Sequence, residues 1–85
     1  MQVPYVYNKA LAITKSDTVN FDPWVTEKRL TDAVYVGGAG IVEAVFQDDT
    51  TADFTAVAGE ILPLAVKRVN STTTTATLMV ALYAN

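Results

Sequence analysis

Short segments in which apolar and polar residues alternate recur along the chain, separated by turn-forming clusters. In 53–58, Phe54, Ala56 and Ala58 share one side of an extended chain, and Asp53 and Thr55 lie on the other. Glycine and polar clusters mark turns at 37–40, 47–51, 58–60 and 70–75. This spacing is typical of small β domains. It predicts strands near 9–14, 18–22, 33–37, 40–47, 53–58, 61–69 and 75–83.

The last two predicted strands are apolar on both sides. This holds for 61–69 and for 76–82. Either both faces are covered within the fold, or a neighbouring subunit covers one of them. Pro63 cannot donate a backbone hydrogen bond, so it indicates an edge strand or a bulge within 61–69.

The pattern as a whole predicts an all-β fold, a small antiparallel β-sandwich or barrel in which 1–85 form one domain. Consecutive strands are expected to pair as hairpins, with Gly37-Gly38-Ala39-Gly40 as one tight turn. One interval differs, since 22–30 is expected to be an irregular loop with at most a short helical turn. That turn would begin at Asp22 before Pro23 and end near Arg29.

Composition supports the β prediction and indicates self-association. Threonine and valine occur twelve times each among 85 residues, and β-branched side chains favour strands. A chain this short, without cysteine, buries only a thin core. Small domains of this kind often gain stability by forming oligomers, so we expect a homo-oligomer.

The same composition excludes several functional classes. Histidine and cysteine are absent, which removes imidazole and thiolate chemistry. The net charge of −3 argues against a nucleic-acid partner. No apolar stretch is long enough to span a membrane, and Met1 to Tyr5 lack the features of a secretory signal. We therefore expect synthesis in the cytoplasm and no membrane partner.

No motif indicates a catalytic residue, a cofactor site or a metal site. The glycines at 37–40 lack the Lys-Ser or Lys-Thr pair of a phosphate-binding loop. Asp48, Asp49 and Asp53 do not have the spacing of a calcium-binding EF-hand, so a solvated acidic turn is expected there. The chain is predicted not to be an enzyme.

Candidate interface residues are the large aromatic and basic side chains, which recur as anchors at protein interfaces. Lys67 and Arg68 are interpreted either as solvated charges that protect a sheet edge or as partners in an intersubunit salt bridge. Trp24 is an alternative platform for a carbohydrate or receptor, with Asp22 nearby. The interface candidates are Trp24, Arg29, Lys67, Arg68 and Tyr83.

Several segments in order resemble small virion proteins of tailed phages and gene transfer agents, the spike-base and head-decoration proteins. Tyr35-Val36-Gly37-Gly38-Ala39-Gly40 and Lys67-Arg68-Val69-Asn70-Ser71 are the most specific of them. The segment from Trp24 to Leu30 departs from the family pattern, so the role of Trp24 rests on the residues alone. The similar segments are 9–14, 16–19, 31–40, 62–64, 66–71, 74–77 and 80–83.

The resemblance implies a non-enzymatic β-rich subunit on the outer surface of a capsid. Its expected partners are the major capsid protein and further copies of itself, with a trimer favoured and a pentamer possible because oligomers on a capsid match its rotation axes. The leading hypothesis is a decoration or cement protein that stabilises the head. The alternatives are the base of a vertex spike, which would also bind a spike or fibre protein, and, from another class, a carbohydrate- or receptor-binding module.

Overall fold

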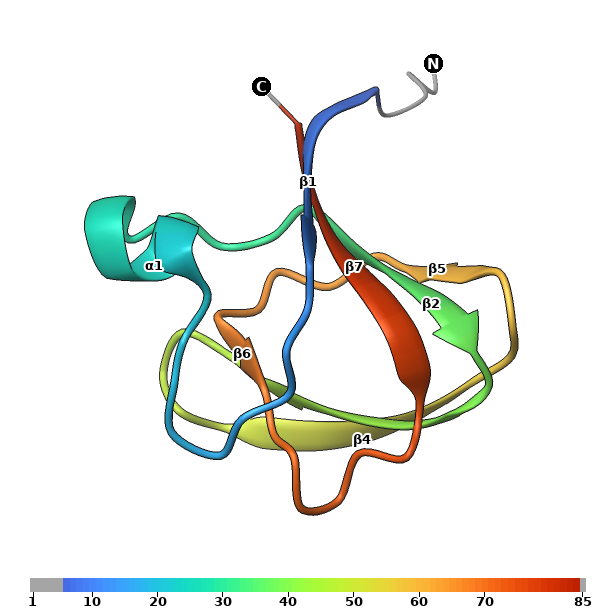
Figure 1. Cartoon of the computed structure of the whole chain (residues 1–85). Coiled ribbons are helices and arrows are strands. Elements are labelled where there is room, and N and C mark those ends of the chain that lie inside the picture. The colour runs from blue at the N-terminus through green and yellow to red at the C-terminus, as the bar shows by residue number, and fades with distance from the viewer. Residues whose placement is uncertain (1–5, 85) are drawn as a thin grey trace.

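The computed structural model describes residues 6–84, which form two antiparallel sheets and one short helix (Figure 1). The all-β prediction is confirmed. The four-stranded sheet has the order β1-β7-β2-β5, and the three-stranded sheet has the order β4-β3-β6. The elements are β1 (Tyr7–Ala12), α1 (Asp22–Glu27), β2 (Ala33–Gly38), β3 (Gly40–Val45), β4 (Thr51–Ala56), β5 (Glu60–Leu62), β6 (Arg68–Val69) and β7 (Thr77–Ala84).

The core lies between the two sheets and is built from small side chains. Val34, Val36 and Met79 face it from the four-stranded sheet, and Val42 and Ala44 face it from the three-stranded sheet. All five are at most 4% exposed. Valine and alanine fill little volume, so the core is as thin as the composition predicts. Residues 1–5, on which the expected lack of a secretory signal rests, lie outside the described residues.

The glycine-rich segment does not form the predicted hairpin. β2 and β3 follow one another across Ala39, yet β2 pairs with β7 and β5 while β3 pairs with β4 and β6. The chain therefore crosses from one sheet to the other here. A Cβ on Gly40 would lie 2.6 Å from the backbone nitrogen of Ala76, and Gly40 has φ +155°. The glycine permits a close approach that a side chain would block.

The predicted strand at 18–22 is also wrong, because a serine side chain turns the backbone there. The Ser16 Oγ accepts hydrogen bonds from the backbone nitrogens of Thr18 (3.2 Å) and Val19 (2.9 Å). Such local bonds compete with extended structure. The segment is a bend followed by coil that leads to α1.

The predicted strand at 61–69 is interrupted after Leu62. The Leu64 nitrogen donates to the Leu62 carbonyl at 2.8 Å, which forms a tight turn beside Pro63. The two remaining pieces, β5 and β6, are edge strands of different sheets. This agrees with the edge position that Pro63 indicates.

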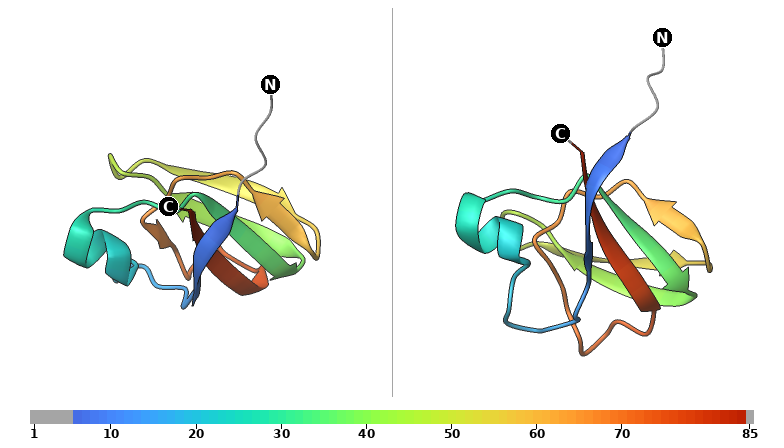
Figure 2. Two further views of the ribbon diagram at one scale, coloured as in Figure 1. Left: turned by 90° about the horizontal axis from the view of Figure 1, so that it is seen from above. Right: turned by 45° about the horizontal axis from the view of Figure 1, so that its top comes forward.

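The helix α1 occupies six residues of the interval 22–30 and lies on the side of the molecule opposite β5 (Figures 1 and 2). The helix begins at Asp22, with Phe21 as its N-cap residue, and Pro23 lies in the first turn, where its missing N–H costs nothing. Lys28 ends the helix in the left-handed conformation. Arg29 lies beyond the helix rather than in its last turn, and its backbone nitrogen donates to the Pro23 carbonyl at 3.0 Å.

Candidate functional site

Trp24 and Lys67, two of the predicted interface residues, lie together beside the β3–β4 turn. Lys67 is only 7% exposed. Its Nζ lies 2.5 Å from Asp49 Oδ1 and 5.4 Å from the centre of the Trp24 ring. The Nζ of Lys28 lies 5.1 Å from the same ring centre. Lys67 is therefore not a solvated edge charge, and the cations over Trp24 disfavour a sugar-stacking platform.

Arg29 and Tyr83, two further candidates, form a second cluster at the end of β7. The Arg29 guanidinium lies 5.2 Å from the Tyr83 ring centre and donates to the carbonyl of Ala84. Asp32 accepts from the Ala84 nitrogen at 2.6 Å. Tyr83 is fully buried, so its ring is held within the subunit.

The environment of Tyr83 opposes ionisation of its hydroxyl. Burial raises the pKa of Tyr83, and the nearby Arg29 charge opposes that effect. Within residues 6–84 the Tyr83 hydroxyl has no hydrogen-bond partner. The group is therefore a neutral part of the core and not an acid or base in a cleft.

Arg68, the remaining candidate, lies apart from both clusters on the outer side of the three-stranded sheet. It is half-buried and donates to the side-chain oxygens of Asn70 (3.1 Å) and Asn20 (3.0 Å). Asn70 in turn donates to Glu43 at 3.0 Å. These bonds orient a polar network on that sheet.

The carboxylates of the turns are occupied by local bonds and do not gather around a metal. Asp48 accepts from the nitrogen and hydroxyl of Thr50, which lowers its pKa. Asp49 is paired with Lys67. Over the described range 6–84, no group of three or more acidic residues has the arrangement of a metal site.

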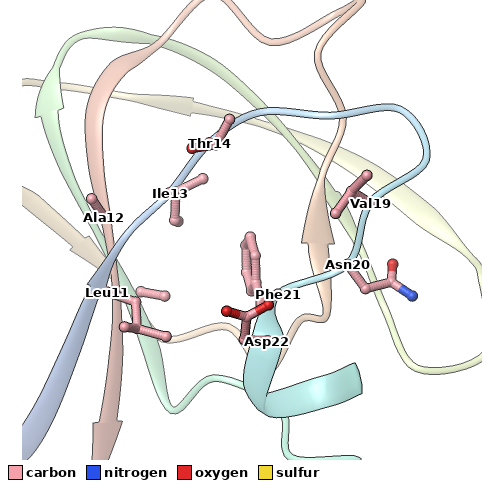
Figure 3. A pocket seen from close by; sticks show the side chains of 9 residues that line it. Leu11, Ala12, Ile13, Thr14, Val19, Asn20, Phe21 and Asp22 are labelled. Atoms are coloured by element: carbon pink, nitrogen blue, oxygen red, sulfur yellow. The ribbon is translucent and has the colours of Figure 1, made fainter. Parts of the chain in front are cut away.

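A hollow of about 210 Å³ lies between β1 and the loop that leads to α1 (Figure 3). Leu11 and Ile13 line it from the β1 side, and Val19 and Phe21 line it from the loop. Figure 3 shows the Phe21 ring between these two segments. Asp22 is the charged residue in its lining, so the hollow offers apolar contact and little chemistry.

The outward face of the four-stranded sheet is apolar, and sequence reasoning did not locate it. One row of cross-strand partners runs across all four strands, from Ala12 of β1 through Val80 of β7 and Tyr35 of β2 to Ile61 of β5. Ala12 and Ile61 are exposed, whereas Val80 and Tyr35 are half-buried. Alternation along the strands adds neighbours to the same side. We call this surface the apolar face; its members are Ala10, Ala12, Tyr35, Ile61, Leu78, Val80 and Leu82.

The sequence left open whether both apolar sides of the last strand are covered within the fold, and the structure shows that one side is not covered by the part of the chain that it describes. Met79, Ala81 and Tyr83 of β7 are buried inside the fold, while Leu78 is 78% exposed on the other side. Nothing in residues 6–84 covers that side of Leu78. The sequence did show that this strand is apolar on both sides. That pattern alone does not tell which side the other sheet covers, so it could not locate the uncovered face.

No helix within the described residues is long and apolar enough to cross a membrane. No family model matches the chain, and no curated protein matches it.

A solved structure provides the informative comparison. The chain is similar to a chain in the structure described as "capsid of native GTA particle computed with C5 symmetry", where GTA denotes a gene transfer agent. The two are 33% identical, with a TM-score of 0.75, and the match covers 93% of this chain and 83% of that one. Sequence and fold therefore agree over nearly the whole domain. The chain belongs to the family of this gene transfer agent capsid chain and is a phage- or gene-transfer-agent-type virion structural protein.

Proposed function

We propose that the chain is a non-enzymatic decoration, or cement, protein that binds the outer surface of a phage-type head and stabilises it as a homo-oligomer. The observation that carries the proposal is the similarity to a gene transfer agent capsid chain over 93% of the sequence. The major capsid protein is the proposed partner. The thin core and the apolar face support association, because both leave stability to be gained from contact.

The proposed oligomer is a closed ring that matches a rotation axis of the shell, and a trimer at three-fold positions is favoured. Light scattering behind size exclusion measures it directly from the subunit mass of 9.1 kDa. A mass three times that of the subunit is the expected result. A monomer in the absence of heads, together with monomeric binding to heads, contradicts the homo-oligomer.

The cement role is tested on heads purified from producing cells that lack this chain. We expect these heads to rupture at a lower temperature than complete heads, and to regain their heat resistance when the purified protein is added back. Release of packaged DNA, followed with an intercalating dye during heating, is the readout. Heads that keep full heat resistance without the protein contradict the cement role.

A second candidate is the base of a vertex spike, which would bind a spike or fibre protein. The similar chain belongs to a capsid described with five-fold symmetry, which is the symmetry of the vertices that such a base would occupy. Copy number per particle separates the two functions. A spike base is a pentamer present only at vertices, whereas a cement protein covers the lattice.

A further inference from the structure

Leu78, at the start of β7, is a strained and exposed apolar residue. Its φ is +53°, in the left-handed region that bulky side chains rarely adopt. Its side chain is 78% exposed, so burial within the subunit does not compensate for the strain. A leucine held in this way is an outlier of the kind that collects at functional sites.

The neighbouring strand makes room for this conformation. A Cβ on Gly37 would lie 2.8 Å from the Leu78 Cβ and 2.8 Å from the Leu78 carbonyl oxygen. Glycine at 37 is therefore required for β2 to pass this close to Leu78. The result is a leucine side chain that projects from the apolar face beside Tyr35 and Val80.

The two outward faces of the molecule differ sharply in charge. The apolar face contains no charged residue among its members Ala10, Ala12, Tyr35, Ile61, Leu78, Val80 and Leu82. The outer side of the three-stranded sheet carries Glu43, Asp53 and Arg68. A charged partner on the apolar face would lose hydration without gaining an ion pair. The surface complementary to it is therefore uncharged and apolar.

The size of the apolar face distinguishes between possible occupants. Four strands about 4.8 Å apart, of which β5 contributes three residues and the others about five of 3.3 Å each, give a footprint of at most roughly 300 Å². Stable pairs bury about 800 Å² on each partner. Two copies joined only through this face would therefore separate. A ring of several copies on a shell makes the same contact once per subunit. Because these contacts are linked, the ring binds the shell more tightly than a single subunit does.

We propose that the apolar face, with Leu78 projecting from one end of it, is the surface through which each subunit docks on an uncharged apolar patch of the capsid shell, and that the charged three-stranded sheet faces solvent. This proposal rests on the proposed function. It assigns contacts between copies to other parts of the subunit.

The test compares Leu78→Asn with the unaltered protein and with Val25→Asn. Asparagine tolerates the left-handed conformation, so Leu78→Asn removes the apolar side chain without disturbing the backbone. Val25 is 59% exposed on α1, away from the apolar face, and serves as the matched control. Binding is measured by co-sedimentation with heads from cells that lack this chain, and native mass by light scattering.

We expect Leu78→Asn to weaken binding to heads by about tenfold or more, as for an interface hot spot, with an unchanged native mass and an undiminished melting temperature. Val25→Asn should bind like the unaltered protein. Undiminished binding of Leu78→Asn overturns the assignment of the face while leaving the cement function in place. A changed native mass without heads shows that the face joins copies of the chain, and also overturns it. Failure of the unaltered protein to bind heads overturns the proposed function itself.

Discussion

Lys67 and Asp49 form an asymmetric ion pair in which the ammonium group is buried and the carboxylate is not. The Lys67 side chain is 8% exposed, and that of Asp49 is 78% exposed, with 2.5 Å between Nζ and Oδ1. The Gln47 carbonyl lies 3.4 Å from the same Nζ. The two partners therefore lose different amounts of hydration on pairing, and removing one is not equivalent to removing the other.

Asp49→Asn should destabilise the fold more than Lys67→Met. The first leaves a buried ammonium without its counter-charge, and we expect a loss of about 1 kcal/mol in the free energy of unfolding. The second keeps the volume and removes the charge, so the change should be smaller. Asparagine also tolerates the φ of +69° at this position. Urea unfolding at neutral pH measures both, and a larger loss for Lys67→Met contradicts this account.

Thr31 fixes the interrupted segment between β5 and β6. Its hydroxyl donates to the Leu64 carbonyl at 2.6 Å and accepts from the Val66 nitrogen at 3.0 Å. Thr31→Val keeps the shape but leaves both backbone groups unpaired. We expect a loss of about 2 kcal/mol, or roughly 10 °C in Tm. Thr31→Ser retains the hydroxyl and should lose much less; equal losses for the two variants would show that the methyl group matters instead.

Asp17 makes stability depend on pH at the acid end. Its carboxylate accepts from the Thr72 hydroxyl and nitrogen and from the Ser71 nitrogen, and these bonds hold its pKa below the ordinary value of 3.8. Since the folded pKa is lower than the unfolded one, the stabilisation is present above pH 3.8 and is lost as the pH falls through the folded pKa.

The measurement is the Tm of Asp17→Ala and of the unaltered protein across this range. The variant should be less stable at neutral pH, and the two curves should converge in acid. Asp53→Ala is the control, because it removes an exposed carboxylate without removing those bonds. Curves for Asp17→Ala that stay parallel down to pH 2 would contradict the link between this carboxylate and acid stability.

Local pattern was sufficient to predict the strands whose faces differ in polarity. In β4, Phe54 and Ala56 point to the core and Asp53 and Thr55 to solvent, as alternation predicts. The crossing between sheets at Gly40 was not predictable in the same way. A glycine-rich segment has the same sequence pattern in a hairpin turn and in a connection between two sheets. The two cases differ in contacts with Ala76, which is distant in the sequence.

The candidate surfaces depended even more on distant contacts. Lys67 is buried because Asp49 and Trp24 reach it from other segments, and no spacing rule joins those three residues. The positive φ of Leu78 could not be predicted from the sequence, because leucine rarely adopts that conformation. The resemblance to virion proteins of phages and gene transfer agents rests on segments of sequence, and it agrees with the match to a gene transfer agent capsid chain, while the decoration and spike-base roles stay proposals.

Tyr83→Phe should leave the fold at least as stable as before. The Tyr83 hydroxyl is buried and has no hydrogen-bond partner within residues 6–84, so its removal ends a desolvation cost and keeps the packed ring. We expect a free energy of unfolding that is unchanged or higher by up to about 1 kcal/mol. Thermal and urea unfolding measure it, and a clear loss of stability would show that the hydroxyl is bonded in solution.

Leu78→Asn should raise the stability of the isolated subunit. Leucine in the left-handed region costs about 1–2 kcal/mol relative to a residue that tolerates it, and the side chain is 78% exposed, so little burial is lost on substitution. We expect a gain of about 1 kcal/mol, which corresponds to roughly 4–8 °C in Tm for a domain of this size. Leu78→Val is the matched comparison, because a β-branched side chain fits this conformation worse and should lower Tm. If both variants melt below the unaltered protein, Leu78 is not strained, and its conformation does not mark it as an interface residue. If Leu78→Asn raises Tm while binding to heads falls, Leu78 lowers the stability of the isolated subunit and strengthens its contact with the capsid.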